Sequence, residues 1–523
     1  MVSDNQELIL SDVEGFLRDE SRKTGWAESI SFPRSEDDVQ KILAILEGKT
    51  PVTIQGARTG ISAGAVPFGG HIMNLSRQTR ILGMRLREAG RFSLIVQPGV
   101  ILSVLNESIA GKEFDTGDWD DESIRAYAAF KDASPHFFPP DPTETSATVG
   151  GMVACNASGA KSYLYGAMRG YVGGLRVVLS DGEVVSLRRG DFIACGRSLS
   201  LDTESGKSRM LELPSYMIPK TKSASGYYIT DNMDAVDLFI GMDGTFGVIT
   251  QLELSLIPLP DTIWGAIFYF TAEAQALDFV IRARGAGGKK VAALEYFDSN
   301  ILDILRRQKL ENPAFLKLPI PPERYRHAIF ADLHCVCETE AFDELLRLEE
   351  CMENAGGNTD DIWAATEPHQ YDEMIEFRHA APECVNMIID HRKKDHPGIT
   401  KLGTDLSVPD DYLLEVMSMY RTTLSEFGLE YAIWGHIGNN HVHVNILPRD
   451  EADFEAGKAL CIEWAKRAVA MGGAVSAEHG IGKLKTEQFA MMYSNKHFAE
   501  MRALKLALDP GGIFGRNTIF PWG

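Results

Sequence analysis

The chain has 523 residues, of which 44% are hydrophobic and 24% charged. A chain of this length is too long to fold around one ordinary hydrophobic core, so we predict at least two folded lobes. The composition excludes a disordered or fibrous protein. The 52 basic and 73 acidic side chains leave a formal charge of -21, which disfavours binding to nucleic acid or to anionic membranes.

The N-terminal segment MVSDNQELILSDVEGFLRDE is acidic and lacks the apolar core of a secretory signal. No run of eighteen apolar residues follows anywhere in the chain. We therefore predict a cytoplasmic protein without a membrane span. The seven cysteines are scattered, with no paired CxxC sets, and they predict neither a disulfide framework nor an iron-sulfur cluster.

The first half of the chain alternates short strand-like runs with glycine-rich turns. Examples are residues 51–60, 91–100 and 171–187, the last with a hairpin signal at Asp181-Gly182. Segments at about 111–137 and 185–222 are charged, Ser-rich and Pro-bearing, with little periodicity. We predict that both are loop insertions that could cover an active site or a partner surface.

From about Thr262 the pattern changes to alternating strands and helices. Strands are predicted at 262–270, 291–297 and 326–337, and helices at 272–284, 300–308 and 340–356. Further helices are predicted at 371–390, 412–427 and 451–473, with a strand-turn-strand unit at 431–448. The alternation predicts an α+β lobe.

Three stretches contain more glycine and small residues than a packed core requires. They are GARTGISAG from Gly56, GGMVACNASG from Gly150 and GMDGTFG from Gly241. Because glycine lacks a Cβ, backbone N–H groups in such loops can approach a pyrophosphate. Tight turns explain any one of these loops equally well, but their number and order favour phosphate binding.

Two histidine-bearing motifs lie near the C-terminal end, GHIGNNHVH at 435–443 and SAEHGIGK at 476–483. Two imidazoles on either side of a tight turn, with a carboxylate from another segment, can form a three-ligand metal site that keeps an open position. A single histidine on a strand is more often a hydrogen-bonded structural residue. The cluster is harder to explain in that way.

The glycine-rich motifs resemble the vanillyl-alcohol oxidase and p-cresol methylhydroxylase (PCMH) type of FAD-binding fold over about residues 30–257. PVTIQGARTGISAGAVP resembles the first pyrophosphate loop, PPDPTETSATVGGMVACNASG the second and LFIGMDGTFGVIT the late flavin-contact segment. The resemblance implies an α+β fold with a two-part FAD-binding domain at 1–258. It also implies a cap domain at 259–455, with an antiparallel sheet flanked by helices in a ferredoxin-like arrangement. Residues 456–523 would complete the active site and pack back on the FAD domain.

The resemblance implies that FAD is bound non-covalently, because the first loop lacks the histidine that carries the flavin in many covalent members. The implied pyrophosphate contacts are Gly56, Arg58, Thr59, Gly60 and Ser62. The implied flavin-lining residues are Pro140, Thr148, Gly151, Asn156 and Ser158, with Ile249 near the ring or the adenine. The chain departs from the family where Ala57-Arg58 replaces glycines and Met242-Asp243 replaces Ser-Glu.

The histidine motifs resemble the metal-binding region of the branch containing D-lactate dehydrogenase, D-2-hydroxyglutarate dehydrogenase and the glycolate oxidase D subunit. This resemblance implies that His436, His443 and Glu478 bind a divalent metal and that His479 is the general base. Zinc is the expected ion, with manganese or iron as alternatives. Asn439-Asn440-His441 replaces the usual Asp-Gly-Asn, so a rearranged site that uses His441 is a second interpretation.

The same branch anchors the substrate carboxylate with an arginine, which Arg378 resembles. Lys401 is a second candidate anchor, although its spacing from Asp405 departs from the family pattern. The implied reaction oxidises a small 2-hydroxy acid (D-lactate, glycolate or D-2-hydroxyglutarate type) to the 2-oxo acid. His479 would take the hydroxyl proton, and a hydride would pass to flavin N5.

The implied partners are the hydroxy-acid substrate and an external electron acceptor or acceptor subunit. Nucleic acid is not expected, and a homodimer is one of the assemblies left open. Two other functions are weighed. One is an electron-transferring flavin subunit without a substrate of its own, and the other is a non-oxidative enzyme similar to alkylglycerone-phosphate synthase.

Overall fold

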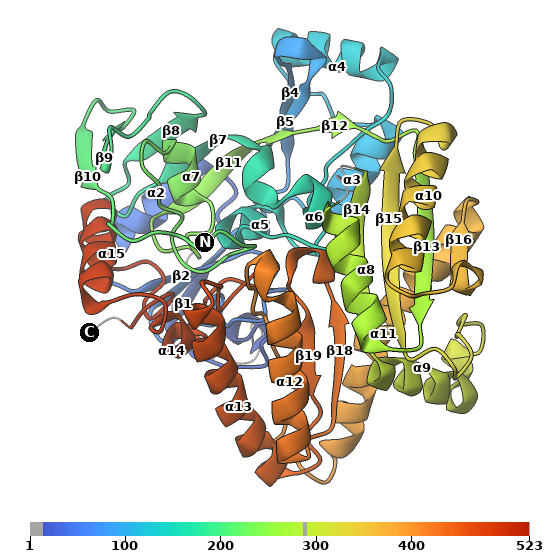
Figure 1. Cartoon of the computed structure of the whole chain (residues 1–523). Helices are drawn as coiled ribbons and strands as arrows, with labels where there is room; N and C mark the ends of the chain where they lie inside the picture. Colours follow the sequence, from blue (N-terminus) through green and yellow to red (C-terminus); the bar gives the residue numbers. More distant parts are fainter. Residues whose placement is uncertain (1–13, 286–289, 522–523) are drawn as a thin grey trace.

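The computed structural model describes residues 14–285 and 290–521, and Figure 1 shows the course of the chain. The first thirteen residues, which hold most of the segment used to predict that there is no secretory signal, lie outside this description. In the part of the chain that is described, no helix is long and apolar enough to cross a membrane.

The N-terminal lobe begins with a small parallel sheet in the order β1-β3-β2. Its strands are β1 (Ser29–Ser31), β2 (Val52–Gln55) and β3 (His71–Asn74), and α2 (Glu36–Ile45) packs beside them. The first glycine loop connects β2 to β3. Ile513 and Phe514, near the end of the chain, complete this core, and Val52 N donates to Ile513 O at 2.7 Å. The C-terminal segment therefore packs back on the N-terminal lobe.

A second sheet in this lobe has five antiparallel strands in the order β4-β5-β11-β7-β8. The strands are β4 (Ile81–Leu86), β5 (Phe92–Val96), β7 (Val172–Val178), β8 (Val184–Arg188) and β11 (Val248–Ser255). The second glycine loop forms α5 (Val149–Cys155), and the third lies between α7 (Ala235–Phe239) and β11. Gly241 N and Asp243 N donate to Val153 O and Ala154 O at 2.9 and 2.8 Å. These bonds bring the second and third glycine loops together.

The predicted insertion at 111–137 contains a helix, α4 (Asp121–Asp132). The Asp120 side chain caps its N-terminus by accepting a hydrogen bond from Ser123 N, and Phe130 is buried. The prediction of an irregular loop is wrong here. Only Ser123, Ala126 and Phe130 of this helix are buried, which is too narrow an apolar face to give a clear helical period.

The predicted insertion at 185–222 contains an antiparallel hairpin of β9 (Ser198–Asp202) and β10 (Ser208–Glu212). Leu199, Leu201 and Leu211 are fully buried. The prediction of a loop is wrong for this part as well, because a five-residue strand with one apolar face produces only two or three alternations. Residues 213–222 contain no helix or strand and lead towards the candidate site.

The C-terminal half is built on a seven-stranded sheet in the order β16-β13-β15-β14-β18-β19-β17. Its strands are β13 (Thr262–Phe270), β14 (Val291–Phe297), β15 (His327–Cys335), β16 (Ile362–Ala365), β17 (Leu402–Gly403), β18 (Tyr431–Gly435) and β19 (His443–Ile446). Every pairing is antiparallel. The first four strands in chain order take the positions 4-1-3-2, which is the ferredoxin-like arrangement predicted for the cap.

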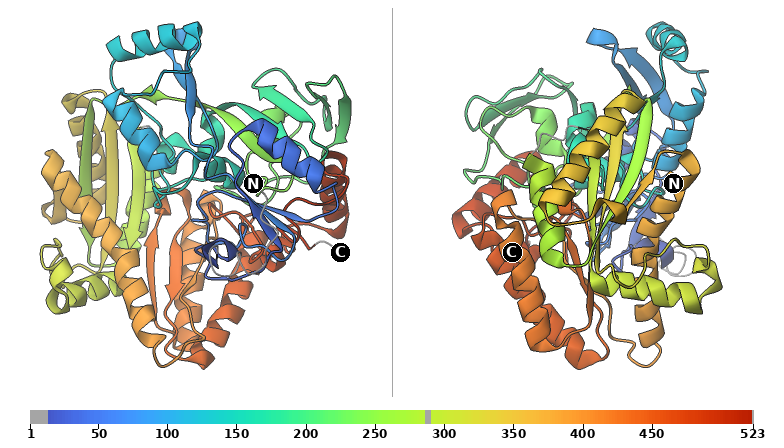
Figure 2. Two further views of the ribbon diagram at one scale, coloured as in Figure 1. Left: turned by 180° about the vertical axis from the view of Figure 1, so that it is seen from behind. Right: turned by 45° about the vertical axis from the view of Figure 1, so that its right-hand side comes forward.

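Helices cover both faces of this sheet, as Figures 1 and 2 show. Successive side chains of β13 point to opposite faces. On one face Phe268 packs against Phe279 of α8 (Glu273–Gly285), with ring centroids 4.7 Å apart. On the same face lies α10 (Glu338–Asn354). A Cβ on Gly265 would instead approach Tyr371 and Met374 of α11 (Pro368–Arg392) on the other face.

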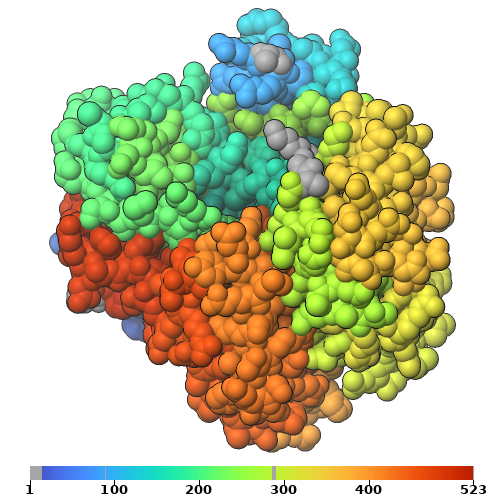
Figure 3. Space-filling view, viewed as in Figure 1, coloured from blue at the N-terminus to red at the C-terminus, as the bar shows by residue number. Residues whose placement is uncertain are grey.

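The remaining elements include the C-terminal helices, of which α15 contacts the N-terminal lobe. Figure 3 shows the C-terminal segment lying against the region of the β9–β10 hairpin, and α15 contacts β10. The other helices and strands are α3 (Leu102–Gly111), β6 (His136–Phe137), α6 (Ser162–Tyr165), β12 (Ile257–Pro258), α9 (Ser299–Glu311), α12 (Leu413–Phe427), α13 (Glu451–Ala470), α14 (Thr486–Phe489) and α15 (Asn495–Leu508).

Candidate active site

The first and second glycine loops meet around a buried hydroxyl group. A Cβ added to Gly56 would lie 2.2 Å from Oγ1 of Thr148, and one added to Gly151 would lie 3.2 Å from the same atom. Thr148 Oγ1 is buried and has no hydrogen-bond partner among the described residues. A buried, unpaired hydroxyl between two glycine-bearing loops fits a polar group of FAD, because such a group would supply the missing partner.

The first loop leaves open space in front of its backbone. A Cβ added to Gly60 would meet no protein atom within 4 Å, whereas Thr59 beside it is half-buried. Arg58 adopts a left-handed φ of 65°, and its guanidinium lies 4.2 Å from the centre of the Phe16 ring. The side chain of Arg58 is therefore held by Phe16, and its backbone lines the loop.

Ser62 joins the first loop to the segment that carries Glu478 and His479. Its hydroxyl donates to the carbonyl of His479 at 3.1 Å, and its own carbonyl accepts from Lys483 N at 2.9 Å. Gly482 is required at this contact, since it has a φ of 53° and a Cβ there would lie 2.1 Å from Ser62 O. The predicted cofactor loop and the predicted catalytic segment are therefore in direct contact.

Of the other residues predicted to line the flavin, Ser158 lies beside Glu478, and the rest are held within the N-terminal lobe. Ser158 Oγ is 3.5 Å from a carboxylate oxygen of Glu478. Asn156 ends α5 with a left-handed φ of 50°, and its Oδ1 accepts a hydrogen bond from Arg169 N. Pro140 and Ile249 are buried, the latter in β11 opposite Val177.

The predicted metal ligands gather around one carboxylate. One ligand atom from each of His436, His443, Glu478 and also His441 lies within 4.8 Å of those of the other three. Nε2 of His436 and Nε2 of His443 are 3.4 and 3.6 Å from Glu478 Oε1. The strand-turn-strand unit places the three imidazoles here, because β18 ends at Gly435, the short turn Ile437–Asn439 follows, and β19 begins at His443.

In each imidazole of this cluster, the second nitrogen lies close to an oxygen atom. Nδ1 of His436 is 2.6 Å from Glu295 Oε1 on β14, and Nδ1 of His443 is 3.1 Å from the Thr404 carbonyl. Nε2 of His441 is 3.0 Å from Asp405 Oδ1. Histidines that bind metals typically have their outer nitrogen held in this way, because the contact fixes the ring and the tautomer. The donor set and its surroundings therefore fit a divalent transition-metal ion.

His479, the predicted base, is the most exposed imidazole of the group, with 28% of its side chain accessible. Its Nδ1 lies 3.2 Å from Asp405 Oδ2, and its ring stacks on His443 with centroids 5.8 Å apart. Asp405 thus contacts His441 with one oxygen and His479 with the other, and it also binds Ser476 and Lys485. Sequence reasoning did not assign a role to Asp405, since a single aspartate carries no pattern of its own.

Two buried cations lie beside the cluster, and only one of them was predicted. Arg378 of α11 donates from Nε to Glu295 at 3.2 Å, and its Nη1 lies 3.4 Å from Nε2 of His379. The second cation is Lys222, whose ammonium is 2.7 Å from Glu478 Oε2. Lys401 forms no ion pair or hydrogen bond with the cluster in the part of the chain described. Burial and the nearby Arg22 guanidinium lower the pKa of Lys401.

Burial and neighbouring charges shift the pKa values of the clustered groups in different directions. Burial disfavours the charged form of His436, but the carboxylates of Glu295 and Glu478 outweigh burial and raise its pKa to about 9. Burial lowers the pKa of His441 to about 3, so this imidazole is neutral at physiological pH. Burial also opposes ionisation of Glu478, yet the Lys222 ammonium and His436 hold its pKa well below the ordinary value. The site therefore offers an ionised carboxylate and a neutral imidazole to a cation.

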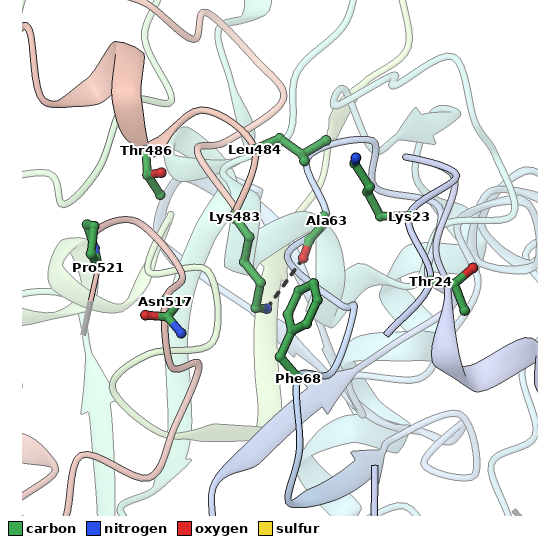
Figure 4. Close-up of a pocket in the computed structure, with 9 residues that line it drawn as sticks. All are labelled: Lys23, Thr24, Ala63, Phe68, Lys483, Leu484, Thr486, Asn517 and Pro521. Atoms are coloured by element: carbon green, nitrogen blue, oxygen red, sulfur yellow. Dashed lines mark hydrogen bonds between the residues drawn. The ribbon is translucent and has the colours of Figure 1, made fainter. Parts of the chain in front are cut away.

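A separate surface pocket of about 540 Å³ lies on the outer side of the first glycine loop (Figure 4). Lys483 crosses it and donates from Nζ to the carbonyls of Ala63 and Gly64 at 3.4 and 2.9 Å. None of the clustered histidines lines this pocket. The ammonium of Lys483 therefore ties the catalytic segment to the first loop.

Comparison with sequence families finds two matches that follow one another along the chain. The FAD binding domain matches residues 27–123 and 128–188. The family described as "FAD linked oxidases, C-terminal domain" matches residues 260–519. The first match contains the first and second glycine loops, and the second contains the whole histidine cluster.

Individual relatives match over almost the whole chain at low identity. The probable mitochondrial D-lactate dehydrogenase of Danio rerio is 26% identical over 494 residues, which cover 94% of this chain and 84% of the relative. The D-2-hydroxyglutarate dehydrogenase of Stutzerimonas stutzeri is 25% identical over 499 residues, covering 94% and 90%. Among solved structures, an alkyldihydroxyacetonephosphate synthase superposes with a TM-score of 0.62 and 13% identity, covering 98% of this chain and 81% of that one. At this identity the superposition shows the fold alone, and it confirms the predicted fold class.

Proposed function

Since the chain belongs to the FAD-linked oxidases and is a distant homologue of D-lactate dehydrogenase, we propose that it oxidises a small 2-hydroxy acid to the corresponding 2-oxo acid. The observation that carries the proposal is the contact between the His436, His443 and Glu478 cluster and the His479–Asp405 pair. An inert electron-carrying subunit would need neither group.

In the proposed chemistry, the hydrogen of the substrate's C2–H bond leaves as a hydride and that of its O–H bond leaves as a proton, and the two go to different acceptors. FAD, when bound, accepts the hydride from C2, and a divalent ion held by His436, His443 and Glu478 would polarise the C2 hydroxyl. His479 takes the hydroxyl proton at Nε2, because its Nδ1 faces the Asp405 carboxylate at 3.2 Å. The hydride's two electrons and one proton would then pass to an external acceptor, and His479 would release the second proton to solvent.

Arg378 is the proposed anchor of the substrate carboxylate. Its Nε pairs with Glu295, which in turn holds His436, so the guanidinium is fixed relative to the metal cluster. The burial of Arg378, with 17% of its side chain accessible, would strengthen a bidentate bond to a carboxylate. The overall charge of -21 repels anions, so this local cation would be needed to admit a hydroxy acid.

The proposal is tested by anaerobic reduction of the bound flavin. Purified protein would be mixed with D- and L-lactate, glycolate, D- and L-2-hydroxyglutarate and D-malate in turn, and bleaching of the visible flavin band would be followed with and without a chelator. We expect rapid bleaching by one acid, loss of bleaching on chelation, and a decrease of about 10²- to 10⁴-fold in the His479→Gln variant.

The controls keep the alternatives distinguishable. His327→Asn removes a buried imidazole from the cap, away from the cluster, and should bleach like the unaltered protein. If flavin-loaded protein is bleached by none of the acids, the proposal fails. An electron-transferring subunit or a non-oxidative enzyme would then be favoured.

A further inference from the structure

His441 is the imidazole of the cluster to which the proposed function gives no role. It is completely buried, with 0% of its side chain accessible. Its Nε2 is 3.0 Å from Asp405 Oδ1. Its Nδ1 lies 3.9 Å from Glu478 Oε2, and neither ring nitrogen meets the geometry of a hydrogen bond with any described residue. A buried ring nitrogen without a partner is costly, so its presence requires a ligand or a compensating contact.

The geometry of His441 repeats that of the two proposed ligands beside it. In His436 and His443, one ring nitrogen is held by an oxygen and the other points at the Glu478 carboxylate. In His441 the same division holds, with Nε2 towards Asp405 and Nδ1 towards Glu478. The centroid of its ring is 5.3 Å from that of His436 and 4.6 Å from that of His443.

His479 differs from His441 although both contact Asp405. His479 lies outside the group of ligand atoms that are within 4.8 Å of one another, and 28% of its side chain is accessible. An accessible imidazole suits proton transfer with a substrate, whereas a fully buried imidazole beside the other ligand atoms suits metal binding.

We propose that His441 is a fourth protein ligand of the metal, through Nδ1, so that the centre consists of three imidazoles and one carboxylate. This inference rests on the proposed function, which supplies the metal. Four protein ligands would close the shell of a tetrahedral ion. The centre would keep a position for the substrate hydroxyl only on a divalent transition-metal ion that accepts five or six ligands, such as Fe²⁺, Co²⁺ or Mn²⁺.

The test compares metal binding by three variants of the FAD-loaded protein after removal of metal with a chelator. His441→Gln keeps an N–H donor for Asp405 but removes Nδ1. His436→Gln removes a ligand of the proposed function, and His327→Asn removes a buried imidazole elsewhere. Isothermal titration with Co²⁺ gives the affinity and the stoichiometry, and pulsed electron paramagnetic resonance of the Cu²⁺-loaded protein reports the number of coordinated imidazoles.

We expect one ion per chain in the unaltered protein and three coordinated imidazoles. His441→Gln should behave like His436→Gln, with two imidazoles and an affinity lowered by more than roughly 100-fold, beyond the 10- to 100-fold typical of a lost outer hydrogen bond. If His441→Gln behaves like His327→Asn and all imidazoles stay coordinated, the inference is overturned and the proposed function stands.

Two further outcomes would also decide whether His441 is a ligand. If His441→Gln does not fold, the imidazole count of the unaltered protein decides, because two coordinated imidazoles would exclude the proposed centre of three. If the unaltered protein binds no ion at all while its flavin is still bleached by a hydroxy acid, the metal is absent from the mechanism and the inference fails with it.

Discussion

Asp405 is the residue that contacts two imidazoles of the candidate site, His441 and His479. One of its oxygens faces His441 and the other faces His479, and burial leaves only 2% of its side chain accessible. His479 and Lys485 outweigh the effect of burial and keep the pKa of Asp405 well below its ordinary value. The carboxylate therefore stays ionised and can hold both rings in the tautomers that point towards Glu478 and the substrate.

Replacing Asp405 with asparagine should therefore impair proton transfer more than cofactor binding. The introduced amide can donate to a ring nitrogen and stabilise the wrong tautomer of His479, so we expect the rate of flavin reduction to fall by about 10²- to 10⁴-fold. The FAD content should be unchanged. Rapid-mixing measurements on Asp405→Asn beside Asp361→Asn, whose carboxylate pairs with Arg324 in the cap, give the comparison, and a decrease smaller than about fivefold would contradict the positioning role.

Metal binding at His436 should depend on pH, because its imidazole must lose a proton to coordinate. Glu295 and Glu478 raise the pKa of His436 to about 9 in the metal-free protein, so the ring is protonated at neutral pH. Metal affinity should therefore increase with pH, by about tenfold for each unit below 9, and binding near pH 7.5 should release about one proton per ion.

Calorimetry in buffers of different ionisation enthalpy measures that proton release. Glu295→Gln removes a negative charge that favours the protonated ring, so in this variant the steep part of the pH dependence should move to lower pH. Binding without proton release in the unaltered protein would show that His436 is not a ligand.

Sequence motifs identify the candidate-site residues that lie in a recognisable local pattern, and they do not identify those that stand alone in the sequence. His436, His443, Glu478 and His479 lie in two short histidine motifs, and the structure brings them together as predicted. Lys222 and Glu295 also contact the cluster, but they stand 256 and 183 positions before Glu478 and belong to no recognisable pattern. Lys401, the second candidate anchor of the substrate carboxylate, forms no ion pair or hydrogen bond with the cluster in the described part of the chain, and its role stays a prediction.

At the scale of elements, the first glycine loop is the part of the proposed cofactor site most open to a direct test. Gly60 has open space in front of it, so an added methyl group meets no protein atom within 4 Å. If the FAD pyrophosphate occupies that space, Gly60→Ala should weaken FAD binding by about tenfold or more, equivalent to roughly 1.4 kcal/mol. The stability of the FAD-free protein should not change.

Gly170→Ala is the matched control, because Gly170 also has no heavy atom within 4 Å but lies outside the glycine loops. FAD affinity can be followed by fluorescence of the released flavin during titration of the FAD-free protein. Equal affinities of the two variants would place the pyrophosphate elsewhere. Gly56→Ala should weaken FAD binding more than Gly60→Ala or Gly170→Ala, because its methyl group would collide with Thr148 even without FAD.

Elements with long, regular patterns are predicted well, and short elements are not. The predicted strands 262–270 and 291–297 coincide with β13 and β14, because each is a mostly apolar run that is largely buried in the cap. In contrast, α4 and the β9–β10 hairpin lie in segments predicted as loops, since their apolar faces are too narrow to give a period. The contact of the C-terminal segment with β2 was implied by family resemblance and could not be derived from periodicity.

At the scale of the whole molecule, one short segment joins the proposed metal ligands to the first glycine loop. Glu478 binds the cluster, and four positions later Gly482 packs on Ser62 of the first glycine loop. The clustered histidines come from the β18–β19 unit of the cap, whereas Ser62 belongs to the N-terminal lobe. Binding of metal at one end should therefore favour FAD at the other, and the coupling must be reciprocal.

This coupling predicts that a chelator destabilises the protein and also loosens FAD. An ion present at 100 times its dissociation constant adds about 2.7 kcal/mol to the free energy of unfolding, so chelation should lower the melting temperature by a few degrees. It should also speed the release of FAD, measured as the rise of free-flavin fluorescence. In Glu478→Gln, which lacks the proposed carboxylate ligand, the chelator should change neither quantity. If a chelator lowers the melting temperature of both proteins equally, the stabilising ion binds elsewhere. If FAD release from the unaltered protein does not change on chelation, the segment from Glu478 to Gly482 transmits no coupling.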